Sequence, residues 1–257
     1  MKKQTHLKKA LAAAALSLLA AAGASAASVH TVPYASLSGA GQIGFEGLAE
    51  GLLEGVVGIG NVQFGERFAG QELSVSKAPR AGEIAQDWFD HLGYGAPTAG
   101  LSLLAGAAGA NLGVYDYGDA DGKALAGIGP LGGEGGDAFG LGAISARFAA
   151  GQSALGFQLR DADGGNGWLA LYRADGSLIQ SIALGPLQNG FYAFAREGGV
   201  ADIAGFSLYN ADPFYGVAID QLRIAGAVTA VPEPASPLLM LAGLPILGAV
   251  LRRRLRR

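Results

Sequence analysis

The stretch that decides the fold reads LGFQLRDADGGNGWLALYRADGSLIQSIAL and occupies residues 155–184. It contains three short apolar segments, 155–160, 168–173 and 177–184, which alternate with clusters of Asp, Gly and Asn. These segments predict strands, because they are bounded by turn residues and do not sustain a helical period. Ala174-Asp175-Gly176 separates the last two segments and predicts a hairpin turn. The stretch therefore predicts antiparallel β-structure.

The same alternation extends to both sides of this stretch. It is clear towards the C-terminus and weaker towards the N-terminus, where long glycine-rich loops separate the apolar segments. A turn of helix is expected within 83–92, and the glycines of 127–142 predict a mobile surface loop. We predict an all-β fold, an antiparallel β-sandwich, with further strands at 42–48, 61–64, 112–115, 143–149, 191–195, 203–209 and 217–224.

Composition narrows the class of protein. The chain has 257 residues, of which 50% are hydrophobic and 15% charged, so it can bury a core and is not an extended disordered protein. Its 43 glycines show no collagen-like period and favour a turn-rich β fold. Because cysteine is absent, disulfides, thiolate catalysis, cysteine-ligated zinc and iron–sulfur clusters are excluded.

Charge is unevenly distributed along the chain. The formal net charge is −3, but four lysines open the sequence and five arginines close it. Without these residues and Glu233, 9 basic and 20 acidic residues remain, a balance of −11. An acidic body repels phosphate groups, so nucleic acid is excluded as a partner. The same charge suits cation binding or solubility outside the cell.

The N-terminus has the organisation of a secretory signal peptide. A lysine-rich start is followed by an apolar run over 10–22 and by Ala24-Ser25-Ala26. The small side chains of Ala24 and Ala26 fit the narrow pocket of signal peptidase. The run is shorter than the about 20 residues of an uncleaved membrane anchor. We predict export through the general secretion machinery and cleavage after Ala26.

The C-terminus combines a proline motif, an apolar segment and a basic end. Val231-Pro232-Glu233-Pro234 precedes the apolar segment 235–251, which would reach about 25 Å as a helix and span a membrane only marginally. The two prolines make the motif stiff and extended, outside the helix. Arginines hold the last residues on the cytoplasmic side and place the body in the periplasm or beyond: Arg252, Arg253, Arg254, Arg256 and Arg257.

Residues 231–257 resemble the PEP-CTERM sorting domain, which has the same order of proline motif, single transmembrane helix and arginine cluster. The resemblance implies recognition by an exosortase, a membrane-embedded protease or transpeptidase of bacteria that make exopolysaccharide. It also implies that the inner-membrane anchor is transient, and that the body ends at the cell surface or in the extracellular matrix. An ordinary tail anchor that begins with VPEP is the alternative.

Two further segments resemble the jelly-roll domains that often precede such tails. They read IGFEGL at 43–48 and AIDQL at 218–222. Both are similar to segments of lectin-like and carbohydrate-binding sandwiches, in which the first and last strands pair and an acidic residue from each shares a structural calcium. The resemblance assigns these two roles to Glu46 and Asp220, and no cofactor other than this calcium is expected.

Motifs for catalysis are sparse. Gly39, Gly41 and Gly44 match G-x-G-x-x-G, but they precede a strand instead of joining a strand to a helix, so they do not predict a dinucleotide site. P-loop, H-E-x-x-H and G-x-S-x-G motifs are absent. After removal of the signal peptide the remaining histidines are His30 and His91, which leaves little imidazole for serine–histidine chemistry.

Acidic residues offer more chemistry than histidines. Asp87, Asp90 and His91 form either a small metal or catalytic cluster or an exposed polar face. The sequence also leaves open a pair of catalytic carboxylates of the kind found in glycosidases. Calcium suits hard oxygen ligands, and two loops supply them unless their side chains only form turns: Asp116, Asp119 and Asp121 in the first, and Asp161, Asp163 and Asn166 in the second.

Sugar binding would require exposed aromatic platforms, although burial is the usual fate of aromatic side chains. Trp168, Ala170 and Tyr172 share one face of a predicted strand, and Leu169 and Leu171 share the other. One of these faces is expected to pack into the core. The candidate platforms are Trp88, Tyr94, Trp168, Tyr209, Phe214 and Tyr215.

The predicted function is that of an exported, non-enzymatic surface or matrix protein that works alongside exopolysaccharide in a biofilm. One alternative is a calcium-dependent carbohydrate-binding module, with an exposed aromatic strip beside the calcium. Another is a secreted glycan-active hydrolase, with two carboxylates that face each other across a cleft. The predicted organisation is a signal peptide (1–26), a flexible segment (27–40), a β-sandwich domain (41–226), a linker (227–230) and the sorting signal (231–257).

Overall fold

The computed structural model describes residues 27–76, 88–133, 139–212 and 216–226. Within these ranges the chain is all-β, and its helical elements are the short 3-10 helices η1 (Tyr34–Leu37) and η2 (Glu197–Gly199). The predicted all-β class is confirmed, and two antiparallel sheets with a shared core are consistent with a β-sandwich. In the described part of the chain, no helix is long and apolar enough to cross a bilayer.

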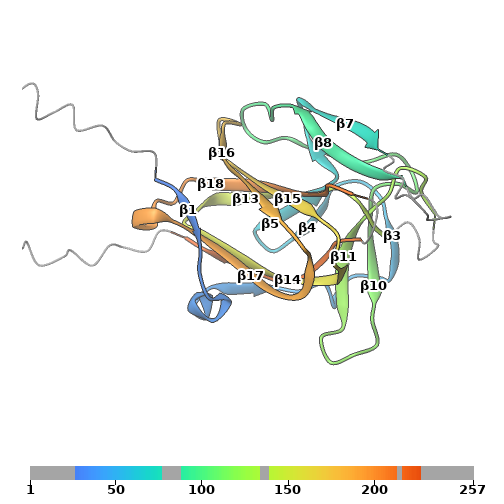
Figure 1. Ribbon diagram of the computed structural model, residues 1–257, viewed down its shortest axis with the longest axis horizontal. Coiled ribbons are helices and arrows are strands. Elements are labelled where there is room, and N and C mark those ends of the chain that lie inside the picture. Colours follow the sequence, from blue (N-terminus) through green and yellow to red (C-terminus); the bar gives the residue numbers. More distant parts are fainter. Residues whose placement is uncertain (1–26, 77–87, 134–138, 213–215, 227–257) are drawn as a thin grey trace, which may run out of the picture.

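The larger sheet forms the lower layer in Figure 1 and has nine strands among the described residues. Its main path runs β1-β17-β14-β19-β11-β10-β3, with β12 beside β11 and β2 beside β19. The strands are β1 (Val29–Thr31), β2 (Gly41–Ile43), β3 (Gly51–Leu53), β10 (Leu112–Asp116), β11 (Lys123–Ile128), β12 (Phe139–Gly142), β14 (Ala154–Asp163), β17 (Gln188–Arg196) and β19 (Ala218–Ala225).

The smaller sheet forms the layer above it and has six strands in the described ranges, in the order β16-β15-β18-β13-β5-β4. All of its neighbours are antiparallel. The strands are β4 (Val57–Ile59), β5 (Val62–Gly65), β13 (Ile144–Gln152), β15 (Gly167–Tyr172), β16 (Leu178–Leu184) and β18 (Ile203–Asn210).

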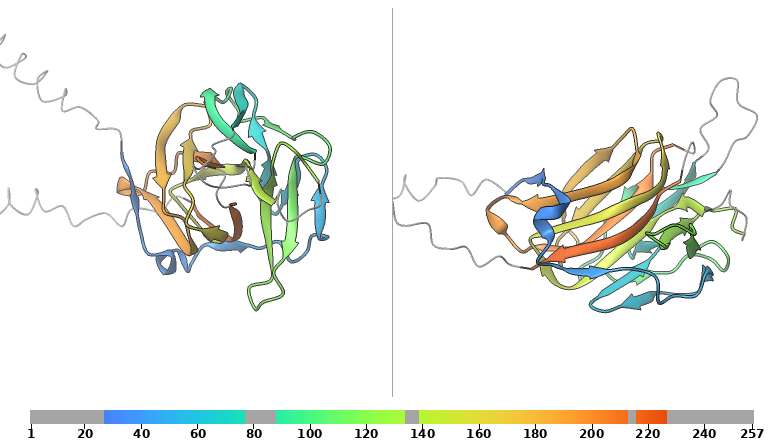
Figure 2. Two further views of the ribbon diagram at one scale, coloured as in Figure 1. Left: turned by 45° about the vertical axis from the view of Figure 1, so that its right-hand side comes forward. Right: turned by 90° about the horizontal axis from the view of Figure 1, so that it is seen from below.

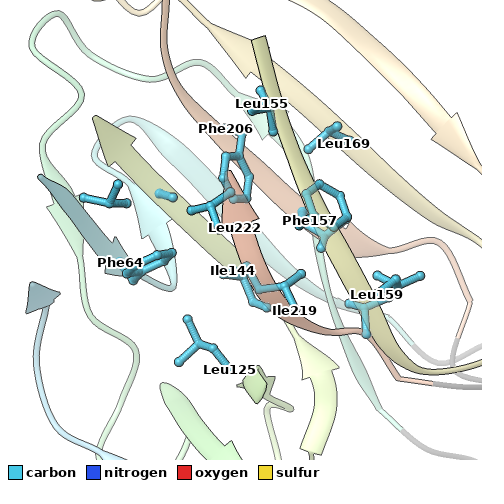
Figure 3. Close-up of a cluster of buried hydrophobic side chains, with 14 of the residues drawn as sticks. Phe64, Leu125, Ile144, Leu155, Phe157, Leu159, Leu169, Phe206, Ile219 and Leu222 are labelled. Atoms are coloured by element: carbon cyan, nitrogen blue, oxygen red, sulfur yellow. The ribbon is translucent and has the colours of Figure 1, made fainter. Parts of the chain in front are cut away.

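The main core lies between the two sheets (Figure 3). Alternate residues of β14, namely Leu155, Phe157 and Leu159, are fully buried there because successive side chains of a strand point to opposite faces. Phe206 of β18 and Leu169 of β15 meet them from the smaller sheet, and the rings of Phe157 and Phe206 lie 6.3 Å apart. Burying each such side chain contributes about 1.5–3 kcal/mol.

The strands predicted from residue 155 onward are all present, with ends that differ by up to a few residues. The predicted hairpin turn joins β15 to β16, and the backbone N–H of Gly176 donates to the carbonyl of Arg173. Gly176 has a φ of 85°, which a glycine adopts without strain. The long apolar segments of this half of the chain therefore carried enough local information to place its strands.

The N-terminal half differs from the prediction in several places. The helical turn at 83–92 is wrong for its described part, because Phe89–Gly95 is strand β8. The strand at 42–48 is shorter, because β2 ends at Ile43 and the chain then turns, with the Leu48 N–H donating to the Phe45 carbonyl. The loop at 127–142 begins inside β11 and ends as β12, and these strands pair.

The segment 27–40 also differs from the predicted flexible segment. β1 pairs with β17, and η1 packs on the outer face of the larger sheet against β14, β17 and β19. Leu37 of η1 is buried against Ala154 and Ala193, so the contact is apolar. These contacts make residues from Val29 onward part of the folded body.

Two small two-stranded sheets cover the outer face of the smaller sheet. They are β6 (Arg67–Phe68) with β9 (Leu103–Leu104), and β7 (Gln71–Ser76) with β8, which lies at the top of Figure 1. They bury a second cluster that includes Phe68, Tyr172 and Tyr209. Both faces of β15 are consequently covered, since Leu169 and Leu171 lie in the main core and Tyr172 lies in the second cluster.

The first and last described residues lie at the same end of the body (Figures 1 and 2). The buried guanidinium of Arg196 pairs with Asp202 at 2.7 Å and also donates to the carbonyl of Ala27. In the turn between β13 and β14, the Ser153 hydroxyl donates to the carbonyl of Gly226 at 2.6 Å. Both ends of the body are therefore fixed by side chains, one at the end of β17 and one directly before β14.

Candidate functional site

A break in the nine-stranded sheet creates the candidate site. Along one edge, β19 pairs with β11 through Ala218 and Ile219 and then with β2 from Leu222 onward. Asp220 and Gln221 fall between these two partners. Ile219 and Leu222 point into the core, so Asp220 lies on the opposite face, which is the outer face of the sheet. The sheet is open there on its solvent side.

A β-bulge on the other edge of β19 accompanies the break. β14 pairs Gln158 with Asp220 but Gly156 with Arg223, so β19 holds one extra residue over this interval. Gln221 has a φ of 49°, in the left-handed region that side-chain-bearing residues rarely adopt. Its side-chain amide donates to the side-chain oxygen Oε1 of Gln158 at 2.8 Å. The bulge bends β19 where Asp220 emerges.

The break holds a hollow of about 590 Å³, which we call the acidic hollow. β19 forms its floor, and its walls come from β2 with the turn that follows it and from the loop between β10 and β11. These segments are far apart in the sequence and meet only because β19 borders both β2 and β11. Five carboxylates line the hollow: Glu46, Asp116, Asp119, Asp121 and Asp220.

Glu46 is held in place by the backbone of the β10–β11 loop. Its Oε1 accepts the backbone N–H of Lys123 at 2.8 Å. The preceding residue, Gly122, has a φ of 70°, and a Cβ there would lie 2.3 Å from the same oxygen. Only glycine fits this position without displacing Glu46. The turn after β2 and the β10–β11 loop are therefore fitted to each other.

Two further carboxylates of the hollow are bound by side chains of β14. Asp119 pairs with Arg160 at 2.7 Å, and Asp121 accepts a hydrogen bond from the Gln158 amide at 2.9 Å. The pKa of the exposed Asp119 is lowered by its hydrogen bond and charge interaction with Arg160, which outweigh its desolvation. Gln158 and Arg160 alternate with the core-facing residues of β14 and thus point to this outer face.

Asp220 is the most buried of the five carboxylates, with an exposed fraction of 2%. Its pKa is raised to about 6, first by desolvation and then by the nearby charges of Glu46 and Asp121. A hydrogen bond from the Gln221 backbone and the charge of Arg160 act in the opposite direction. A carboxyl group in this setting is stabilised by any cation or hydrogen-bond donor that enters the hollow.

The structure brings together the residues of two separate sequence predictions. Glu46 and Asp220, which resemblance assigned to a shared calcium, meet Asp116, Asp119 and Asp121 of the first predicted calcium loop. In the described ranges, however, no group of three Asp, Glu, His or Cys side chains converges closely enough to hold a metal ion. A cation in the hollow would therefore have to draw carboxylates away from their present hydrogen-bond partners.

The second predicted calcium loop lies elsewhere. Its Asn166 donates to Asp212 at 2.7 Å, which links the start of β15 to the residues after β18. The side chains of Asp161 and Asp163 are not among those that the structure describes. This loop is thus separate from the acidic hollow.

An aromatic stack flanks the hollow on the β17 side. Tyr34 of η1 stacks on Phe191 with ring centres 4.6 Å apart, and the Arg223 guanidinium lies 4.3 Å above the Tyr34 ring. Gly156 makes room for Tyr34, because a Cβ there would lie 2.9 Å from Cδ2 of the ring. Gln42 holds Arg223 from the rim of the hollow at 3.0 Å. The stack is continuous with the hollow.

A second aromatic cluster flanks the hollow on the β10 side. The Tyr115 ring lies 4.9 Å from Tyr117 and 5.9 Å from Phe139. Arg160, which pairs with a carboxylate of the hollow, stacks its guanidinium 4.4 Å from the Tyr117 ring. Phe139 lies over Gly113, where an added Cβ would come within 2.6 Å of its ring. The hollow thus has an aromatic–arginine stack on each side.

The aromatic residues predicted as sugar platforms are not the ones beside the hollow. Trp88 and Trp168 are half-buried, Tyr209 is buried, and Tyr94 is exposed on β8, which covers the other sheet. Phe214 and Tyr215 lie outside the described residues. Sequence reasoning missed Tyr34, Tyr115 and Phe191, because only the pairing of distant strands places these rings around one site.

Asp90 and His91 of the predicted Asp87–Asp90–His91 cluster lie on β8. Asp90 is 1% exposed beneath β8, and among the described residues its Oδ1 has no hydrogen-bond partner. Burial and the nearby Glu66 raise its pKa to about 7. His91 packs edge-on against Tyr209 of the second cluster, with ring centres 5.6 Å apart. Asp87 lies outside the described residues, so this prediction stays untested as a cluster.

A second hollow, of about 550 Å³, lies beside the two ends of the body. It is lined mainly by small and apolar residues, and its arginine, Arg196, is already paired with Asp202. It therefore offers little free hydrogen-bonding chemistry.

The residues of the sorting and processing predictions lie outside the described residues; they are Ala24 and Ala26, Val231 to Pro234, and the arginines from Arg252 to Arg257. No protein-family model matches the chain, and no curated protein matches it.

Proposed function

We propose that the chain is an exported, non-enzymatic surface or matrix protein. In this proposal a signal peptide delivers a jelly-roll-like body, and an exosortase processes the PEP-CTERM-like tail at a site of exopolysaccharide secretion. The observation that carries the proposal is the order of the tail: Val231-Pro232-Glu233-Pro234, a short apolar segment and a terminal arginine cluster. A proline motif held at the membrane surface is accessible to a membrane-embedded protease.

The position of the two ends of the body supports this proposal. The residue after the predicted signal cleavage, Ala27, and the last described residue, Gly226, are bound at one end of the sandwich by Arg196 and Ser153. A leader and a tail that join the body at one end leave the rest of its surface free for contacts in a matrix. The acidic charge of the body suits a soluble extracellular domain.

The test compares the mature protein from hosts with and without the exosortase. Intact mass and cell fractionation should show a body that has lost the residues after the VPEP motif in the first host only. Glu233→Ala should abolish this processing, whereas the matched change Glu50→Ala, at an exposed position of the body, should not. An arginine tail that persists in every strain would identify an ordinary membrane anchor instead.

Calcium-dependent carbohydrate binding is a second candidate function, and one observation favours it. Glu46 and Asp220 share the acidic hollow, with Asp121 close enough to raise the pKa of Asp220. Carboxylate oxygens are the ligands that calcium prefers, and extracellular calcium sites bind in the range of about 0.1–1 mM. Calcium would also relieve the repulsion among these carboxylates.

The test of this second candidate is thermal unfolding with calcium or with EDTA. Calcium should raise the unfolding midpoint of the wild type, and Glu46→Gln should remove most of the increase. Glu72→Gln, at an exposed position of β7 on the other side of the molecule, is the matched control and should keep it. An equal increase in all three proteins would place the ion outside the hollow.

A further inference from the structure

The two main sheets end in four strands, and one of these strands differs from the others. β1 and β3 end the main path of the nine-stranded sheet, and β4 and β16 end the six-stranded sheet (Figure 1). β1, β3 and β4 have three residues each, whereas β16 has seven. A short end strand offers few unpaired backbone groups to another chain. β16 does not have this protection.

β16 also lacks the charges and prolines that usually protect an end strand. It reads LIQSIAL, and residues 176–195 contain no charged side chain. In the described part of the chain, β15 is the only strand that pairs with it. A bulge at Ile179 interrupts the register at one end, so the regular segment is 180–184. Along this segment, alternate backbone N–H and C=O groups point away from the sheet.

The side chains of segment 180–184 leave room for a further strand. Ser181 and Ala183 are small and exposed on the outer face. Ile182 points inward and is half-buried against the main core. The side-chain oxygen of Gln180 accepts the backbone N–H of Val29 at 3.0 Å, which ties this side chain to β1 of the other sheet. Small or inward-facing side chains therefore line the edge.

The charge of the body favours a second copy of this chain as the added partner. With 9 basic and 20 acidic residues, two bodies repel each other over most of their surface. This repulsion is weakest where neither copy carries charge, and β16 provides such a segment. Two antiparallel copies of one strand also match in length, and their two-fold axis closes the contact without leaving a further free edge.

We infer that β16 is a self-association edge, at which two copies of the chain pair antiparallel about a two-fold axis at Ile182. In this register Ile182 faces Ile182 of the second copy, and Ser181 faces Ala183. The β-branched pair lies on the core side and completes the burial of both isoleucines. The contact joins the two smaller sheets into one continuous sheet, and it requires neither calcium nor a sugar.

The contact is weak in dilute solution. Stable interfaces use about 20–30 residues a side, and a ladder over 180–184 is much smaller. We expect half of the protein to be dimeric at a concentration of about 0.1–1 mM. Many copies that are held together at a cell surface or in a matrix reach such local concentrations.

The experiment is sedimentation velocity of the mature protein at concentrations from about 0.01 to about 1 mM. The sedimentation coefficient of the wild type should rise with concentration. Ala183→Lys should weaken association roughly tenfold, because the two lysines of a dimer would be diagonal neighbours across the ladder. Ala183→Val stays uncharged and adds a β-branched side chain, so it should still dimerise.

Asn61→Lys is the matched control, because it adds the same charge at an exposed turn between β4 and β5, at the opposite end of the same sheet. It should dimerise as the wild type does. Far-ultraviolet circular dichroism and the unfolding midpoint, both measured on dilute protein, check that each variant is folded.

Three outcomes would overturn the inference. A wild type that stays monomeric at about 1 mM would leave β16 to a strand from a different protein. A wild type and Ala183→Lys that dimerise equally would place the contact on another surface. If Asn61→Lys weakens association as much as Ala183→Lys does, the added charge is the cause and its position on the edge is not.

Discussion

The two outer faces of the sandwich are covered to different extents. The smaller sheet is covered by β6–β9 and β7–β8, which bury a second apolar cluster and a polar network beneath them. Among the residues that the structure describes, the larger sheet is covered by η1, by loops and by aromatic side chains that lie over small residues, including Gly156, Gly113 and Ala124. Its centre stays open at the acidic hollow.

This difference shows in how each face treats its polar groups. On the covered face, Ser145 and Ser207 bond to each other at 2.7 Å, Gln71 bonds to Tyr172 at 3.0 Å, and all four are buried. On the open face, five carboxylates line the acidic hollow. The satisfied polar network of the covered face contributes to stability. The open face instead leaves polar groups accessible to a ligand.

The largest expected effect on stability comes from adding a side chain at Gly156, on the open face of the larger sheet. Gly156→Val should destabilise the body by about 3 kcal/mol, because a Cβ would lie 2.9 Å from Cβ of Ala193, from the Tyr192 carbonyl and from the Tyr34 ring. Chemical denaturation measures this loss. Gly58→Val is the control, since a Cβ there meets nothing within 4 Å. Equal losses in both variants would mean that Tyr34 does not lie over Gly156.

The next effect concerns the buried carboxyl of the covered face. Burial raises the pKa of Asp90 to about 7, above its ordinary 3.8, so the folded state binds the proton more tightly than the unfolded state does. This contribution to stability is fully present below about pH 3.8 and is lost as the pH rises from there through about 7. Asp90→Asn should therefore stabilise the body by roughly 2 kcal/mol at about pH 8, and hardly at all near pH 4.

Thermal unfolding of wild type and Asp90→Asn at both pH values measures this difference. Glu72→Gln, exposed on the partner strand of β8, is the control and should change neither value by much. A variant that is equally stabilised at both pH values would show that the charge of Asp90 is not the cause.

A smaller effect on stability is expected from the polar network beneath β6–β9 and β7–β8. Ser207→Ala should cost about 1 kcal/mol, because it leaves the buried Ser145 hydroxyl without its partner. The double variant Ser145→Ala/Ser207→Ala should recover part of this loss, since both partners are then apolar. A double-mutant cycle in denaturant measures the coupling, and purely additive losses would argue against the bond.

The smallest effect is expected at the rim of the open face. Gln42→Ala removes two exposed hydrogen bonds to Arg223, at 3.0 and 3.3 Å, and should change the free energy of unfolding by less than about 0.5 kcal/mol. A loss as large as that of Ser207→Ala would show that the rim contributes to stability as much as the covered network does.

The sequence predicted the strands of the second half of the chain better than those of the first. Strands such as β14 and β18 are long, and the apolar core residues of β14 alternate with Gly156, Gln158 and Arg160. β3, β4 and β9 have two or three residues each and carry no pattern of their own. Phe89 and Leu92 suggest a helical spacing, but they are buried because β8 covers the smaller sheet. Tertiary contacts decide such segments.

The candidate site was predictable only in part. Resemblance pointed to Glu46 and Asp220, and the structure places both in one hollow, although Glu46 lies in a turn and not in a strand. The meeting of both residues with the β10–β11 loop depends on how β19 pairs with β2 and β11, which no local pattern encodes. The bulge at Gln221 was likewise invisible, because glutamine gives no sign of a left-handed backbone.

The position of β19 determines how the body would respond to mechanical load. The strand that leads into the tail has β14 on one side and β2 and β11 on the other. A pull on a tethered tail would act along this interior strand, so the ladders on both sides would have to shear together, whereas an edge strand could be peeled away one bond at a time. A body anchored through β19 would therefore resist a pull on its C-terminus better than one anchored through an edge strand.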